Sequence, residues 1–221
     1  MYAVKEIFYT LQGEGANGGR PAVFCRFSGC NLWSGREQDR ASAQCRFCDT
    51  DFVGTDGEGG GRFPTAQELA EAVRALWPKA GVGAGIRPLV VCTGGEPLLQ
   101  LDSPLIDAFH HKGFEVAIET NGTKAIPAGI DWAVVSPKGT TEIVVDRCDE
   151  LKLVYPQRDA PPERFEHIVA ERYYLSPMVA AHRQPDDPLY RDENTRLAIE
   201  YCLNNPRWRL SLQTHKVINI A

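Results

Sequence analysis

The sequence lacks the features of a membrane protein and of a nucleic-acid-binding protein. No apolar run approaches the ~18 residues that a membrane-spanning helix needs. The first residues, 1–6, have neither the basic nor the apolar part of a signal peptide. Basic residues are outnumbered, 24 Lys and Arg against 29 Asp and Glu, whereas nucleic acids and anionic membranes attract basic surfaces. We therefore expect a cytoplasmic protein with no nucleic-acid or membrane partner.

Disulfides are rare in such a compartment, so the seven cysteines need another explanation. Four stand singly in apolar or amphipathic segments and are typical of small buried side chains. These four are Cys25, Cys92, Cys148 and Cys202. The other three, Cys30, Cys45 and Cys48, occur together in a polar segment. The clustered three are therefore candidate metal ligands.

The chain alternates short β-branched runs with helical patterns, which favours a parallel sheet. The expected strands are 21–28, 88–93, 114–119, 132–136, 151–155, 172–176 and 209–213. No internal repeat or low-complexity linker divides the chain. We therefore expect a single domain over residues 1–221, with an insert at about 31–44 in the cysteine segment.

Three helices are marked by their ends. Thr65 and Glu68 form a capping box, Ser103 is the expected cap of a second helix with Pro104 in its first turn, and a third pattern runs over about 194–203. Little room for a long helix remains between 132 and 155, so a closed eightfold barrel cannot be built. We expect an α/β fold, a partial, open (β/α) barrel of about six parallel strands.

Polar motifs follow six of the expected strands at their carboxyl ends. They are Cys30, 93–96 (Thr-Gly-Gly-Glu), 120–122 (Thr-Asn-Gly), 136–138 (Ser-Pro-Lys), 176–178 (Ser-Pro-Met) and 213–216 (Gln-Thr-His-Lys). The carboxyl ends of parallel strands open onto one face, and in β/α folds this face carries the active site. We expect the six motifs to converge on one site at this face of the sheet.

The cysteine segment has the spacing Cys-x14-Cys-x2-Cys. The close pair Cys45 and Cys48 can present two thiolates to one centre, and Cys30 supplies a third. Thiolates select iron–sulfur clusters or zinc. A structural zinc takes four ligands, but no His or Cys lies between Cys48 and Cys92, whereas three thiolates leave one iron of a 4Fe–4S cluster open. A zinc loop that borrows a distant ligand, or three incidental thiols, stays open at this point.

Further motifs extend from one end of the chain to the other. They are 8–15 (FYTLQGEG), 49–50 (DT), 93–97 (TGGEP), 119–122 (ETNG), 136–138 (SPK) and 211–216 (SLQTHK). With the three cysteines, they resemble the radical S-adenosylmethionine superfamily and, within it, the 7-carboxy-7-deazaguanine synthase family of the queuosine pathway. Two features depart from the pattern. Fourteen residues, rather than the usual three, separate Cys30 from Cys45, and we expect them to form a small helix or lid. Ser176 stands where relatives tend to carry glutamine.

The resemblance implies a carbon–nitrogen lyase that contracts 6-carboxy-5,6,7,8-tetrahydropterin to 7-carboxy-7-deazaguanine with loss of ammonia. It implies that the three cysteines hold a 4Fe–4S cluster whose open iron binds S-adenosylmethionine, and that Thr50 binds Mg²⁺. It also implies a flavodoxin-like external electron donor and a homodimer. Two alternatives stay open. One is another small radical enzyme, such as an activator of a glycyl radical on a partner protein, and the other is a non-enzymatic zinc-loop binding module.

The resemblance also implies binding roles for individual residues. The expected cofactor-binding residues are Phe47, Cys48, Asp49, Gly94, Gly95, Glu96, Ser136, Pro137, Lys138, Ser176, Pro177 and Met178. The expected substrate-binding residues are Leu11, Gln12, Gly13, Glu14, Arg26, Thr93, His215 and Ala221. Gly94 and Gly95 have no side chain to block close approach, and Glu96 is expected to accept from the cofactor's ammonium. Arg26 can bind the pterin carboxylate through two parallel hydrogen bonds.

Overall fold

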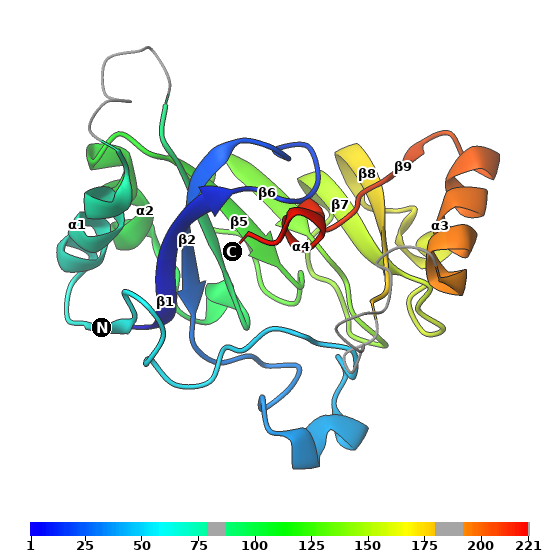
Figure 1. Cartoon of the computed structure of the whole chain (residues 1–221), viewed down its shortest axis with the longest axis horizontal. Coiled ribbons are helices and arrows are strands. Elements are labelled where there is room, and N and C mark those ends of the chain that lie inside the picture. The colour runs from blue at the N-terminus through cyan, green and yellow to red at the C-terminus, as the bar shows by residue number, and fades with distance from the viewer. Residues whose placement is uncertain (79–86, 180–191, 221) are drawn as a thin grey trace.

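The computed structural model describes residues 1–78, 87–179 and 192–220. One nine-stranded sheet runs through them in the order β3-β1-β2-β4-β5-β6-β7-β8-β9 (Figure 1). The strands are β1 Tyr2–Leu11, β2 Pro21–Phe27, β3 Gly61–Phe63, β4 Leu89–Gly94, β5 Glu115–Thr120, β6 Trp132–Val135, β7 Arg147–Tyr155, β8 Val169–Pro177 and β9 Trp208–Leu210. The helices are α1 Ala66–Leu76, α2 Ser103–His111, α3 Glu193–Asn204 and α4 Thr214–Ile218, with the 3₁₀ helices η1 Glu37–Ser42, η3 Pro97–Leu99 and η4 Pro162–Phe165.

The sheet is mostly parallel and open. Successive neighbours from β2 to β9 pair in parallel, while β1 and β3 add an antiparallel edge beside β2. In the described part of the chain the two outer strands, β3 and β9, do not pair with each other. The expected partial, open α/β barrel is confirmed, with seven strands in its parallel part rather than about six.

The helices begin where the sequence predicts, with one change of capping residue. At α1 the Thr65 hydroxyl accepts from the Glu68 amide at 3.2 Å, which is the first half of the expected capping box. The Glu68 carboxylate accepts from the Thr65 hydroxyl at 2.9 Å rather than from the Thr65 backbone amide. At α2 the cap is Asp102, whose carboxylate accepts from the Leu105 amide at 3.1 Å, and Ser103 is the first helical residue. No helix in the described ranges is long and apolar enough to cross a membrane.

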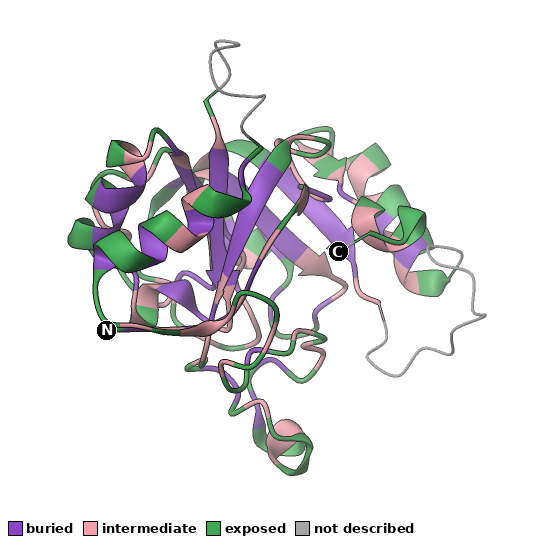
Figure 2. Cartoon of the chain, turned by 60° about the vertical axis from the view of Figure 1, so that its left-hand side comes forward, coloured by how far each residue is buried: buried purple, intermediate pink, exposed green. Residues whose placement is uncertain are grey.

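The two faces of the sheet differ because side chains alternate along each strand. On β2, Cys25 and Phe27 belong to the large apolar cluster formed with α1 and α2, whereas Phe24 belongs to a smaller cluster on the other face. Figure 2 shows the buried sheet, with the exposed sides of the helices turned outward. Arg26 lies on the same face of β2 as Phe24 and nearer the carboxyl end of the strand. On β2 this second face is therefore apolar at Phe24 and polar at Arg26.

The cysteine segment projects from the edge at which the parallel strands end (Figure 1). It contains the 3₁₀ helix η1, so the expected small helix in the insert is confirmed. Trp33 packs edge-on against Phe52, with 5.7 Å between the ring centroids. The guanidinium of Arg40 lies 4.2 Å from the centre of the Trp33 ring. The insert therefore packs against the chain that follows Cys48, and Trp33, Ala43 and Phe52 form an apolar cluster separate from the main core.

Candidate active site

The six polar motifs meet around one cavity of about 200 Å³ at the carboxyl ends of the strands. This first cavity is lined by Cys30, Cys45, Phe47, Cys48, Asp49, Thr50, Thr93, Gly94, Gly95, Thr120, Asn121, Ser136, Lys138, Ser176, Pro177, Met178 and Gln213, among others. They come from strands and loops far apart in the sequence. The parallel topology therefore brings most of the expected cofactor-binding residues to one place.

The three clustered cysteines line the first cavity as free thiols. A hydrogen bond from Cys45 is the main reason why the pKa of the Cys48 thiol falls to about 6, and the same bond raises the pKa of Cys45. The Leu32 amide donates to Cys30 Sγ at 3.4 Å. Three thiols facing one cavity, one of them readily ionised, fit an iron–sulfur cluster held by three thiolates.

Gly94 and Gly95 are required by packing as well as by access to the cavity. Gly94 has φ +134°, a conformation that side chains disfavour. A Cβ on Gly94 would lie 2.2 Å from the Phe27 carbonyl oxygen, and one on Gly95 would lie 2.1 Å from the Gly29 carbonyl oxygen. The glycine pair therefore lets β4 pack against the chain that leads into Cys30, while its backbone still lines the cavity.

Glu96 and Pro137 are not brought to the cavity wall. The Glu96 side chain is fully buried, and its carboxylate accepts from the Thr120 hydroxyl at 2.7 Å and the Asn121 amide at 2.8 Å. The structure thus places Glu96 behind the residues that line the cavity, and its expected role as an acceptor for the cofactor's ammonium stays a prediction. These bonds make Glu96 a residue that holds the ends of β4 and β5 together.

A second cavity of about 350 Å³ adjoins the first. Its lining includes the expected substrate-binding residues Leu11, Gln12, Gly13, Glu14, Arg26, Thr93 and His215. Ala221 lies outside the described residues. Glu14, Thr93 and Glu119 line both cavities. These side chains can therefore contact a ligand in either cavity.

Lys152 forms the centre of a buried charge cluster between the cavities. Its Nζ lies 2.8 Å from Glu14 Oε2 and 3.6 Å from Glu119 Oε1. Burial lowers the pKa of Lys152, but the carboxylates of Glu14, Glu119 and Glu150 outweigh burial and hold it above the usual value. Burial raises the pKa of Glu14, yet Lys152 outweighs that effect and keeps the Glu14 carboxyl ionised.

Glu119 and Lys152 were not among the residues with an expected role. Glu119 accepts from Thr93 Oγ1 at 3.0 Å and from Gln12 Nε2 at 3.2 Å. The signal for Lys152 was a single lysine between Leu151 and Leu153, in a strand expected to be buried. A buried lysine is rare unless it is paired, so this position alone indicates a partner carboxylate.

The C-terminal segment closes over the loop that follows β1. Gln213 Nε2 donates to Glu14 Oε1 at 3.1 Å, and the Thr214 amide donates to the Gly13 carbonyl at 3.0 Å. The His215 ring packs on Gly13, where a Cβ would lie 2.1 Å from Nδ1, and burial lowers the pKa of this histidine. The motif of residues 211–216 therefore completes the second cavity.

Comparisons with known proteins agree on one family, although no protein-family model matches the chain. The chain is 60% identical over 219 residues to a 7-carboxy-7-deazaguanine synthase of Caulobacter vibrioides. It is 59% identical over 222 residues to one of Bordetella pertussis. Each alignment covers 99% of both sequences. The crystal structure of QueE from Escherichia coli matches 97% of this chain and 94% of its own, with a TM-score of 0.66 and 28% identity.

The fold and the three-cysteine cavity define a radical S-adenosylmethionine enzyme, a class that uses a 4Fe–4S cluster and S-adenosylmethionine. Within that class the sequence identities are decisive. The chain belongs to the 7-carboxy-7-deazaguanine synthase family. The resemblance drawn from the motifs is therefore confirmed, and neither the glycyl-radical activator nor the zinc-loop module finds support among these relatives.

Proposed function

We propose that this chain contracts 6-carboxy-5,6,7,8-tetrahydropterin to 7-carboxy-7-deazaguanine with loss of ammonia, as a carbon–nitrogen lyase of queuosine biosynthesis. The observation that supports this most directly is the pair of adjoining cavities, one walled by thiols and the other by carboxylate, amide and guanidinium groups. Offered 6-carboxytetrahydropterin and tetrahydropterin without the carboxylate, the reconstituted protein should release ammonia only from the first. Equal release from both would exclude recognition of the carboxylate.

The first cavity is the proposed cofactor site. Cys30, Cys45 and Cys48 would hold the cluster, and Gly94 and Gly95 would bring backbone groups close to S-adenosylmethionine. When bound, the cluster and S-adenosylmethionine supply the radical that removes a hydrogen atom from the substrate. The remaining proposed contacts are Phe47, Asp49, Ser136, Lys138, Ser176, Pro177 and Met178.

The protein itself shields and neutralises this cavity. The apolar cluster of Trp33, Ala43 and Phe52 packs against Cys30 and Cys48 and excludes water from one side of the thiols. The Lys138 ammonium, which also lines this cavity, is close enough to Cys45 and Cys48 to influence their ionisation. A cation there offsets the negative charge of thiolate ligands.

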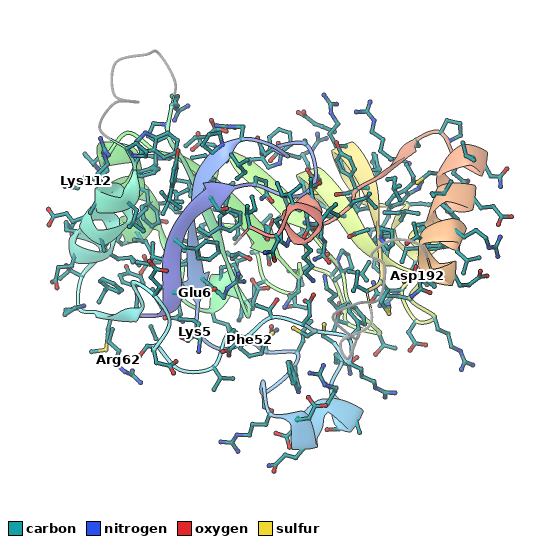
Figure 3. The ribbon with its side chains drawn as sticks, in the orientation of Figure 1. Lys5, Glu6, Phe52, Arg62, Lys112 and Asp192 are labelled. Atoms are coloured by element: carbon teal, nitrogen blue, oxygen red, sulfur yellow. The ribbon has the colours of Figure 1, made fainter. Side chains whose placement is uncertain are left out.

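The second cavity is the proposed pterin site. A pterin edge carries several N–H donors, and Gln12, Glu14 and Glu119 supply acceptors for them. Lys152 keeps Glu14 ionised, so this side chain can only accept. Arg26 Nε donates to Glu6 Oε1 at 2.7 Å, which fixes the guanidinium and leaves the Nη edge to pair with the substrate carboxylate. Figure 3 labels Glu6 on β1.

Arg26→Ala is expected to raise the KM for the carboxypterin by about 30-fold or more, because truncating one partner of a buried charge pair costs roughly 2–5 kcal/mol. Steady-state kinetics measure the change. S-adenosylmethionine cleavage without the pterin should stay normal, since Arg26 lines the second cavity but not the first. The matched control is Arg62→Ala on β3, an exposed residue that lines neither cavity. An unchanged KM in Arg26→Ala would contradict the carboxylate assignment.

Thr50 is the proposed magnesium ligand, and its position lining both cavities supports this. A hydroxyl is a hard oxygen donor, and Mg²⁺ keeps several waters while bridging to substrate oxygens. In the described residues, 1–78, 87–179 and 192–220, Thr50 is not joined by a group of three His, Asp or Glu side chains that could hold a metal ion. One protein ligand with water and substrate is therefore the arrangement that we propose.

Thr50→Ala is expected to raise the Mg²⁺ concentration for half-maximal activity by about tenfold, the effect of losing one supporting ligand. Thr50→Ser keeps the hydroxyl and should restore the wild-type requirement. Magnesium titrations of the three proteins make the comparison. A Thr50→Ser variant as impaired as Thr50→Ala would assign the effect to packing of the methyl group instead.

A homodimer and a flavodoxin-like electron donor are also proposed. Exposed apolar side chains support the dimer, since Leu11 on β1 and Val217 and Ile218 on α4 are all exposed. Arginines in the cysteine segment support an acidic donor, because Arg36 and Arg46 are exposed within it. Exposed guanidinium groups beside the cluster can pair with carboxylates of an acidic redox partner.

A further inference from the structure

In the part of the chain that the structure describes, two buried side-chain atoms have no hydrogen-bond partner among the protein's own groups. They are Nε1 of Trp132, on β6, and Oε1 of Glu150, on β7. Buried donors and acceptors are nearly always paired, because an unmade hydrogen bond costs free energy. Two such atoms on neighbouring strands therefore point to a shared ligand.

Both residues line one small cavity behind the active site. The centre of a water-sized sphere can occupy about 10 Å³ there, which is close to what one water molecule needs. The cavity is also walled by Gln12, Glu14 and Lys152. Val91, Ala117 and Val134 complete the wall, so the cavity is mixed in character. It has the size of one water and adjoins the charge cluster between the two larger cavities.

We propose that one water molecule binds in this cavity between Trp132 Nε1 and Glu150 Oε1, and that Glu150, held by this water, positions the loop that carries Glu14. A water accepts from the indole N–H and also donates to a carboxylate or accepts from a carboxylic acid. It therefore satisfies both atoms in either state of Glu150.

The geometry of Glu150 explains how it acts on the loop. Its Oε2 accepts from the Ala16 amide at 2.9 Å. A Cβ on Gly15 would lie 2.1 Å from Oε1, so the carboxylate fits directly under a residue whose φ of +63° already favours glycine. From the other side, Ser211 Oγ accepts from the Gly15 amide at 2.9 Å. The loop next to Glu14 is therefore held between β7 and the C-terminal segment.

The surrounding charges disfavour the ionised form of Glu150, so a second hydrogen-bond donor would stabilise its carboxylate. Burial raises the pKa of this carboxyl, Lys152 opposes that effect, and Glu119 and Glu14 add to it. With only 1% of Glu150 exposed, its hydrogen bonds come from the protein and from the proposed water. Loss of the water would free one oxygen to move and would loosen its bond to Ala16.

The water itself is tested by high-resolution crystal structures of the wild type and of Trp132→Phe. The wild type should show one density peak within hydrogen-bond distance of both Trp132 Nε1 and Glu150 Oε1. The variant, which lacks the indole N–H, should show a weaker peak or none. A wild-type structure without the peak would overturn the proposal, whatever the protein's activity.

The positioning role is tested by kinetics, and it rests on the proposed pterin site. Trp132→Phe should raise the KM for the carboxypterin about fivefold, the effect of one hydrogen bond. Its kcat and its cleavage of S-adenosylmethionine without the pterin should not change. Trp208→Phe on β9, which lines neither large cavity, is the matched control and should leave KM unchanged.

Two replacements of Glu150 distinguish the effect of its hydrogen bonds from the effect of its side-chain volume. Glu150→Gln keeps an acceptor for the Ala16 amide and a group that bonds the water, so its KM should stay within about twofold of the wild type. Glu150→Leu keeps only the volume, and we expect its KM to rise more than tenfold. Equal impairment of the two variants, or an unchanged KM in Trp132→Phe, would overturn the positioning role. A wild-type protein that never turns over the pterin would overturn the proposed function instead, and the crystal structures would still decide on the water.

Discussion

Cys45→Ala should purify without an iron–sulfur cluster and should not cleave S-adenosylmethionine. Cys45 is 7% exposed, is hydrogen-bonded to Cys48 and lines the first cavity with the other two thiols. With one of three thiolates removed, the cluster loses a third of its protein ligands. Visible absorbance with iron and sulfide analysis after anaerobic reconstitution measures the loss, and deoxyadenosine formation measures the cleavage.

Cys202→Ala is the matched control for this prediction. Cys202 lies on α3, is only partly buried and lines neither of the two large cavities, so its removal should leave iron content and cleavage unchanged. A Cys45→Ala protein with a full complement of iron and sulfide would contradict the assignment of the three cysteines as ligands.

Lys152→Met is expected to lower the free energy of unfolding by roughly 3–5 kcal/mol at neutral pH, the usual cost of removing one partner of a buried ion pair. Methionine fills much of the volume of lysine, so lost packing is a minor part of the effect. Glu14 and Glu119 would remain in the interior without their cation. Denaturant unfolding of the apoprotein measures the difference.

The pH dependence of that difference distinguishes charge from packing. Lys152 outweighs burial and lowers the pKa of Glu14 from 4.5 to about 2 in the folded protein. A lowered carboxyl pKa stabilises the fold above the unfolded value, and this contribution is lost as the pH falls through the folded value. The gap between wild type and Lys152→Met should therefore be largest near pH 7 and shrink between about pH 4.5 and 2.

A surface lysine provides the control. Lys112, labelled in Figure 3, pairs with Glu71 at 3.2 Å, and the Glu71 side chain is 67% exposed. Such surface pairs contribute about 0–1 kcal/mol, so Lys112→Met should unfold almost like the wild type at every pH. A Lys152→Met protein with wild-type stability at pH 7 would contradict the role of Lys152 as the centre of the cluster.

The parallel part of the fold could be predicted because its signals are local. Each of its strands is a short β-branched or aromatic run followed by a turn motif. The antiparallel edge could not be predicted in this way. β1 carries Lys5 and Glu6 side by side, and its register with β2 shifts between Val4 and Glu6, so the alternation that marks a half-buried strand is broken. β3 has three residues and forms only by pairing with β1.

The same distinction between local and long-range signals applies to the residues of the site. The cysteines, the glycine pair and the polar strand ends could be predicted, since topology alone brings strand ends together. The buried partners could not, because each pairing joins strands distant in sequence. Lys152 pairs with Glu14, which is 138 residues away in the sequence. The Glu96 carboxylate accepts from Thr120 and Asn121 at the end of the neighbouring strand. Only the folded sheet shows which charges face one another.

One measurement tests the central claim most directly: the mass of the product after anaerobic turnover. The protein is reconstituted with iron and sulfide and then given reductant, S-adenosylmethionine, Mg²⁺ and 6-carboxy-5,6,7,8-tetrahydropterin. We predict a brown protein that forms a product with the mass of 7-carboxy-7-deazaguanine. A brown protein that cleaves S-adenosylmethionine and leaves the pterin unchanged would contradict the assignment of the second cavity to this substrate.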